Sequence, residues 1–105
     1  MASRAATEAF ENLALSLRDE DGVTFEPSGL VVHGKLFAFL QGERLVVELP
    51  ESRSRDLVTR GVAATFVSEG HPSRKWVSVA DVQLWDELAR ESHEFVGEPP
   101  IGGQS

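Results

Sequence analysis

Three histidines are the first candidates for chemistry in this chain of 105 residues. His33, His71 and His93 lie in separate segments, and none belongs to an H-x-x-x-H or H-E-x-x-H pattern, which would set two metal ligands on one helix face. The chain has no cysteine, which excludes disulfides, thiolate ligands and thiol nucleophiles. We therefore expect no metal site and no cofactor.

The hydroxyl and carboxylate side chains also lack the spacing of a catalytic site. No serine lies in a G-x-S-x-G turn, and Ser92, His93 and Glu94 are sequence neighbours whose side chains diverge around a helix. Only Glu48 has an apolar context, and strand alternation directs it away from the core as an exposed residue. No glycine-rich phosphate loop is present. The sequence predicts a protein without catalytic residues, not an enzyme.

Basic residues are concentrated in the middle of the chain, where five of the ten lie between positions 53 and 75. Beside an aromatic residue they would form a cationic patch that holds an anionic ligand or nucleic acid. In the alternative interpretation, Arg53 and Arg60 pair with Asp56 and the loop cations are simply solvated. The candidate interaction patch consists of Arg53, Arg60, His71, Arg74, Lys75 and Trp76, with Arg55 beside them.

The overall charge works against nucleic acid as a partner. Seventeen acidic and ten basic side chains give a formal charge of -7, which repels phosphate backbones and anionic lipid. No stretch reaches the roughly 18 apolar residues that span a bilayer, and the first residues have no apolar run of signal-peptide length. We expect a cytoplasmic protein with no membrane contact, for which nucleic acid is disfavoured but not excluded.

Composition predicts one domain. The hydrophobic fraction of 41% and the charged fraction of 26% are ordinary for a globular protein with a single core. We place this domain at residues 1–96. The tail at 97–105 contains two prolines and three glycines, has little to bury, and is expected to be disordered.

Helical periodicity appears in three segments. Apolar residues recur at three- and four-residue intervals between positions 3 and 18. A short helix is expected from Pro50 to Arg60, since proline suits a first turn and Gly61 suits the end. The last helix is capped by Asp81. Its expected buried face consists of Val82, Trp85, Leu88, Ala89, Ser92, Phe95 and Val96.

The remaining segments are typical of strands. Runs at 23–25, 30–33, 35–40 and 45–49 are separated by turn residues and predict an antiparallel meander. Two later strands, 63–67 and 75–79, are joined by a polar loop. The fold class is therefore α+β, a two-layer antiparallel sheet with helices, in the order helix, three or four strands, helix, two strands, helix.

Both faces of this sheet appear apolar in the sequence. Strict alternation through 35–40 places Leu36, Ala38 and Leu40 on one side, and Phe37 and Phe39 on the other. Trp76 likewise falls opposite the valines that follow it. Either helices and loops cover the second face, or that face is a contact surface for a protein partner or a homodimer.

Four segments of the chain resemble the N-terminal domain of TfoX-like proteins, with a weaker likeness to the MmcQ/YjbR group. They are Gly34–Ala38, Arg44–Pro50, Gly70–Val77 and Trp85, within a resemblance that covers roughly Gly29 to Val96. It implies a two-layer α+β domain and a role in transcriptional regulation, with DNA binding in some members and no catalytic residues. Two positions depart from the family pattern. Its Met-Phe-Gly-Gly segment is here replaced by residues 25–29, and a common lysine by Glu48.

Three functional hypotheses remain open from the sequence. The leading one is a non-enzymatic interaction or regulatory domain that binds a protein, or itself, through the sheet face or the Arg74–Trp76 edge. The second is nucleic-acid binding through the cationic patch, in a transcription-associated protein. The third is a small-ligand-binding protein or enzyme with a pocket lined by His71 and Trp76.

Overall fold

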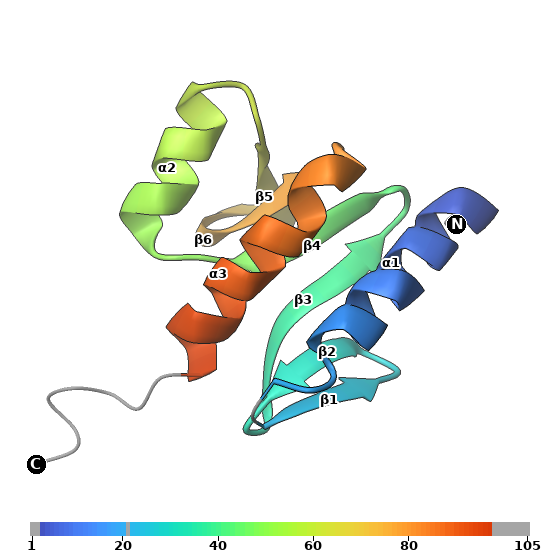
Figure 1. Cartoon of the computed structure of the whole chain (residues 1–105). Coiled ribbons are helices and arrows are strands. Elements are labelled where there is room, and N and C mark those ends of the chain that lie inside the picture. Colours follow the sequence, from blue (N-terminus) through green and yellow to red (C-terminus); the bar gives the residue numbers. More distant parts are fainter. Residues whose placement is uncertain (1–2, 21, 98–105) are drawn as a thin grey trace, which may run out of the picture.

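A computed structural model describes residues 3–20 and 22–97 (Figure 1). In these residues the fold is α+β, with an antiparallel sheet and three α-helices in the predicted order. The elements are α1 (Arg4–Leu17), β1 (Val23–Glu26), β2 (Gly29–Val32), β3 (Lys35–Gln41), β4 (Arg44–Glu48), α2 (Glu51–Thr59), β5 (Ala64–Ser68), β6 (His71–Val79), the 3-10 turn η1 (Val82–Leu84) and α3 (Trp85–Gly97). The predicted tail lies, apart from Gly97, outside the described residues.

Local signals set the helix ends. The Ser3 side chain accepts a hydrogen bond from the Ala6 N–H at 3.1 Å and caps α1. Pro50 precedes α2, and Gly61, with a φ of 77°, follows its last turn. These positions confirm the first two predicted helices within one or two residues.

The sheet has the strand order β1-β2-β3-β4-β6-β5, and every neighbouring pair is antiparallel. The first four strands form the predicted meander. Its β2–β3 turn consists of His33 and Gly34, whose φ angles of 50° and 82° produce a tight two-residue hairpin. The chain then crosses through α2, and β6 inserts between β4 and the edge strand β5.

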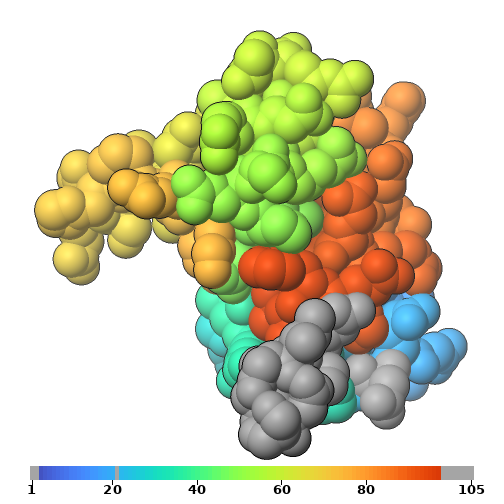
Figure 2. Space-filling model, turned by 90° about the vertical axis from the view of Figure 1, so that its left-hand side faces the viewer, coloured from blue at the N-terminus to red at the C-terminus, as the bar shows by residue number. Residues whose placement is uncertain are grey.

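The β5–β6 connection differs from the prediction. A polar loop was expected over 68–74, but β6 begins at His71 and the turn is only Glu69–Gly70, with φ angles of 53° and 80°. Pro72 sits inside β6 at a place where that strand pairs with the edge strand alone. The hairpin therefore extends beyond the sheet, and its turn projects from the body of the molecule (Figure 2).

The predicted alternation in β3 is wrong at Leu36 and Phe37, because Leu36 lies on the side opposite to Ala38 and Leu40. The register shifts between Leu30 and Val31, so that Leu30 pairs with Ala38 while Val31 pairs with Leu36. This bulge leaves Phe37 unpaired, and both Phe37 and Ala38 join the core, fully buried. A bulge is a long-range pairing feature that the residue order of β3 did not reveal.

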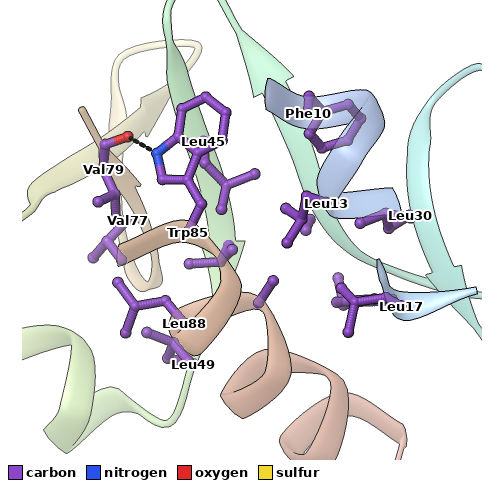
Figure 3. Packing of buried hydrophobic residues seen from close by; sticks show 14 of the residues in the cluster. Phe10, Leu13, Leu17, Leu30, Leu45, Leu49, Val77, Val79, Trp85 and Leu88 are labelled. Carbon is purple, nitrogen blue, oxygen red and sulfur yellow. Dashed lines mark hydrogen bonds between the residues drawn. The ribbon is translucent and has the colours of Figure 1, made fainter. Parts of the chain in front are cut away.

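All three helices pack on one face of the sheet. Helices α1 and α3 lie side by side in front of it (Figure 1), and α2 joins the same side through the buried Leu57. Figure 3 shows the core between the layers, where the indole N–H of Trp85 donates to the Val79 carbonyl at 2.9 Å. The residues that line this covered face are mainly aliphatic: Leu30, Val32, Leu45, Val47, Leu49, Val77 and Val79.

The start of the last helix also departs from the prediction. Asp81 does act as a cap, because its carboxylate accepts from the Gln83 N–H, but it caps η1 rather than α3. Val82 was expected to be buried and is 49% exposed. The tighter 3-10 turn rotates Val82 off the face that continues from Trp85.

Candidate interaction surface

Among residues 3–20 and 22–97, no helix lies on the second face of the sheet. Strand pairing defines which side chains share it, because partners in register lie on the same side. We call this surface the open face. Its apolar members are Val31, Leu36, Phe39, Val46, Ala64, Phe66 and Trp76, and its polar members are Thr24, Glu26, Gln41, Arg44, Glu48 and Ser78.

Three aromatic rings form the centre of the open face. The ring of Phe39 on β3 lies 5.7 Å, centroid to centroid, from Phe66 on β5 and also 5.7 Å from Trp76 on β6. Because β4 lies between β3 and β6, the rings close over Val46, which is 0% exposed. The three rings themselves are only half-buried. Apolar surface thus remains in contact with solvent along the middle of the sheet.

Two opposite charges flank this cluster. Arg44 and Glu48 lie at the two ends of β4, on the same side as Val46. The Arg44 Nε donates to the Ser78 hydroxyl at 3.1 Å, and Glu48 sits opposite Trp76 in the register. Neither side chain makes an ion pair with any other described residue, although most cations near the helices do.

The cationic patch expected from the sequence is divided between different surfaces. Trp76 points to the open face, whereas Arg53 points to α3 and donates two hydrogen bonds, of 2.9 and 3.0 Å, to the Glu91 carboxylate. These bonds raise the pKa of Arg53 above its ordinary value. Arg60 pairs with Asp56 at 3.3 Å, as the alternative interpretation predicted. Two members of the patch therefore have their charge balanced locally.

The remaining members of the patch lie along β6. Lys75 places its Nζ 5.7 Å from the centre of the Phe95 ring on α3, a cation–π contact on the covered side. His71 is exposed beside the projecting turn. Arg74 has no ion pair within the described ranges and borders a cleft between α2 and the β5–β6 hairpin.

That cleft includes one member of the predicted patch, Arg74, and a second, wider hollow between Pro50 and α3 includes another, Arg53. The cleft has a volume of about 220 Å³ and is lined by Arg55 and Arg74 together with Glu51, Ser54 and Ser73 among others. Neither His71 nor Trp76 lines it, so the pocket predicted from those two residues is not formed there. Glu51 lies 3.9 Å from Arg55 and offsets its charge.

No group of three or more histidine or acidic side chains within 3–20 and 22–97 is arranged to hold a metal ion. His93 packs against the Phe37 ring at 5.8 Å, and its neighbour Ser92 donates to the Phe37 carbonyl at 2.9 Å. The two side chains thus hold α3 to the bulged strand. Every helix in this part of the chain is also too short or too polar to cross a membrane.

A separate polar network closes the far edge of the helical layer. Arg90 on α3 bonds to Asp86 at 3.0 Å, to Glu20 at 3.1 Å and to the Ser16 hydroxyl at 2.8 Å, which ties α3 to the end of α1. The Arg90 hydrogen bond lowers the pKa of Asp86, and the same bond raises the pKa of Arg90. This network stabilises the fold and faces away from the open face.

Comparison with known proteins adds no relative: no family model matches the chain, and neither the curated proteins nor the solved structures contain a significant match. The resemblance to the TfoX N-terminal domain accordingly stays a prediction. Sequence reasoning identified Trp76 and the apolar second face, but it missed the contribution of Phe66 and the two charges at the ends of β4. Alternation within β4 and β5 does place Phe66, Arg44 and Glu48 on one face of each strand. Without the strand order, however, it does not show that these faces belong to the same side of the sheet.

Proposed function

We propose that this chain is a non-enzymatic interaction domain, with a regulatory role, that binds a protein through the open face. The supporting observation is the aromatic cluster of Phe39, Phe66 and Trp76, which is half-buried and has no described helix over it. Aromatic residues set in a flat apolar surface with a polar rim are the usual composition of a protein-binding site. The resemblance to a regulatory family without catalytic residues supports the same interpretation.

Nucleic acid is less well supported as the occupant. Arg53 and Arg60 are engaged by carboxylates, and Lys75 is directed to the helical side. The open face itself offers one cation, Arg44, beside two anions, Glu26 and Glu48. Such a surface gives little electrostatic attraction for a phosphate backbone, which needs several unpaired cations on one side.

Site-specific photo-crosslinking in the native host tests the proposal. Benzoylphenylalanine replaces Phe66 on the open face or, as a matched control, Phe25, which is 56% exposed and lies against Phe10 on the helical side. We expect a discrete crosslinked protein species from position 66 and none from position 25.

A second change in the crosslinker-bearing chain shows whether the open face itself is recognised. With the crosslinker at position 66, Trp76→Asp, shown by circular dichroism to be folded, should abolish the crosslinked species, whereas Val82→Asp, at an exposed residue away from that face, should leave it unchanged. Equal crosslinking from positions 66 and 25, or an unchanged crosslink from the Trp76→Asp chain, would refute the open face as the binding surface.

A further inference from the structure

The charges on the open face have a self-complementary arrangement. Arg44, Val46 and Glu48 alternate along the same side of β4, so that a cation and an anion lie at equal distances on either side of a buried valine. At about 3.3 Å per residue, Arg44 and Glu48 are separated by about 13 Å along the strand. Neither has an ion-pair partner within residues 3–20 and 22–97.

We infer that the protein bound by the open face is a second copy of this chain, in a symmetric dimer that stacks the two open faces. The inference rests on the proposed function and names its partner. The two-fold axis of this dimer lies midway between the two sheets, perpendicular to β4 and level with Val46. It therefore reverses the direction of β4 in the second copy. Arg44 of one copy then stands opposite Glu48 of the other, and the same pair recurs on the other side of the axis.

The dimensions of stacked sheets suit this arrangement. Two sheets that pack face to face lie about 10 Å apart, with strand directions within about 30° of each other. An extended arginine and an extended glutamate bridge such a gap from opposite sides. The aromatic cluster of each copy, half exposed in the single chain, would be covered between the two charge pairs.

The net negative charge of the chain opposes self-association except where opposite charges balance locally. Two chains of formal charge -7 repel each other over most of their surfaces. At the centre of the open face, however, Arg44 and Glu48 on β4 cancel, and the third charge of the face, Glu26, lies apart on the edge strand β1. Because an isologous interface places one surface against itself, a balanced and symmetrically spaced pair of charges at its centre suits self-association.

Charge reversal on purified chain tests the dimer by sedimentation equilibrium at micromolar concentrations. Wild-type chain should sediment as a dimer. Arg44→Glu places two like-charge pairs in the interface, as does Glu48→Arg, and each variant should weaken the dimer by at least about tenfold, since opposed like charges disfavour a specific interface. An equimolar mixture of the two variants should restore it, because every pair across that heterodimer is again one of opposite charge.

Matched variants control for net charge and folding. Lys35→Glu and Glu43→Arg change the charge by the same amounts at exposed positions off the open face and should leave the dimer unchanged. Restoration by mixing also shows that both reversed chains are folded. The double variant Arg44→Glu/Glu48→Arg should dimerise like wild type, because it swaps the two charges and still places a glutamate opposite an arginine in both pairs.

The outcomes separate this inference from the proposed function. A monomeric wild-type chain, together with a crosslink from position 66 to a different protein, would overturn the dimer and leave the interaction domain standing. A wild-type dimer that is insensitive to both reversals, or variants that remain monomeric on mixing, would overturn the stacked geometry. If position 66 gives no crosslink and the chain is monomeric, both proposals are refuted.

Discussion

Two adjacent valines in β4 show how differently the two sides of the same sheet are built. Val46 and Val47 are both 0% exposed. Val47 belongs to the core, under the helices, whereas Val46 is sheltered only by side chains of neighbouring strands, chiefly the aromatic cluster. Full burial of a residue therefore does not show that its surroundings are sealed from solvent.

The difference between the two sides lies in what covers them. Aliphatic side chains on the covered face pack against helices that are held by buried hydrogen bonds, such as the one from the Ser92 hydroxyl to the Phe37 carbonyl at 2.9 Å. The open face relies on half-buried rings lying across the strands. Rings of this kind protect the backbone beneath them and still present area to a partner, which suits an association surface.

The two tryptophans give the largest expected contrast. Trp85→Ala on the covered face should lower the free energy of unfolding by about 3–5 kcal/mol, because it leaves a cavity and removes the bond to Val79. Trp76→Ala on the open face should cost only about 1–2 kcal/mol, since its ring is already partly hydrated. Urea unfolding at nanomolar concentrations, where association is absent, measures both. Equal losses would contradict the contrast between the faces.

Val46 and Val47 allow the same substitution to be compared on the two faces of the sheet. Val47→Ala should destabilise the chain by about 2 kcal/mol, because the helices above it cannot close the cavity fully. Val46→Ala should cost about half as much, since the partly exposed rings of Phe39 and Trp76 have room to shift into the space. A larger loss at Val46 would mean that the open face is packed as rigidly as the core.

Serine substitutions test the polar contacts on each side. Ser92→Ala removes a buried hydroxyl that donates to the Phe37 carbonyl, and we expect a loss of about 1–2 kcal/mol. Ser78→Ala should cost less than about 0.5 kcal/mol, because the exposed Arg44 can bond to water instead. Thermal unfolding of the two variants beside wild type gives the ranking, and a reversed order would show that the Arg44–Ser78 bond is structural.

The smallest effect is a pH dependence at the edge of the helical layer. Arg90 lowers the pKa of Asp86 in the folded chain, so this pair stabilises the fold above the ordinary carboxyl pKa and the contribution disappears as the pH falls through the lowered value. Asp86→Asn should lower the free energy of unfolding by about 0.5 kcal/mol at pH 7, a typical value for an exposed ion pair. Below about pH 3 the free energies of the variant and the wild type should differ less. Unfolding curves at both pH values check it. A gap that widens in acid would contradict the assignment.

Local signals carried most of the fold. The periodic apolar residues between positions 3 and 18 defined α1, and His33–Gly34 defined a hairpin, because helical periodicity and tight turns depend on residues close in sequence. The strand alternation around Trp76 was also correct, since Val77 and Val79 are buried under the helices. The start of β6 was missed because Pro72 resembles a loop residue, and an edge hairpin tolerates it.

The site was less predictable than the fold. The patch residues Arg53 and Trp76 both lie in the second half of the chain, but helix packing directs Arg53 to α3 and strand alternation directs Trp76 to the open face. Conversely, Phe39 and Phe66 meet although they come from strands that are not adjacent in the sheet. No local pattern encodes such a contact.

By itself the sequence determined the fold class, the three helices, the His33–Gly34 turn and the absence of cysteine chemistry, all of which depend on short-range geometry or composition. Tertiary structure alone decided that the bulge buries Phe37, that the basic residues separate, and that three rings gather between Arg44 and Glu48. The physical reason is that register and strand order are set by pairing between distant segments, and a shift of one residue moves a side chain to the opposite face.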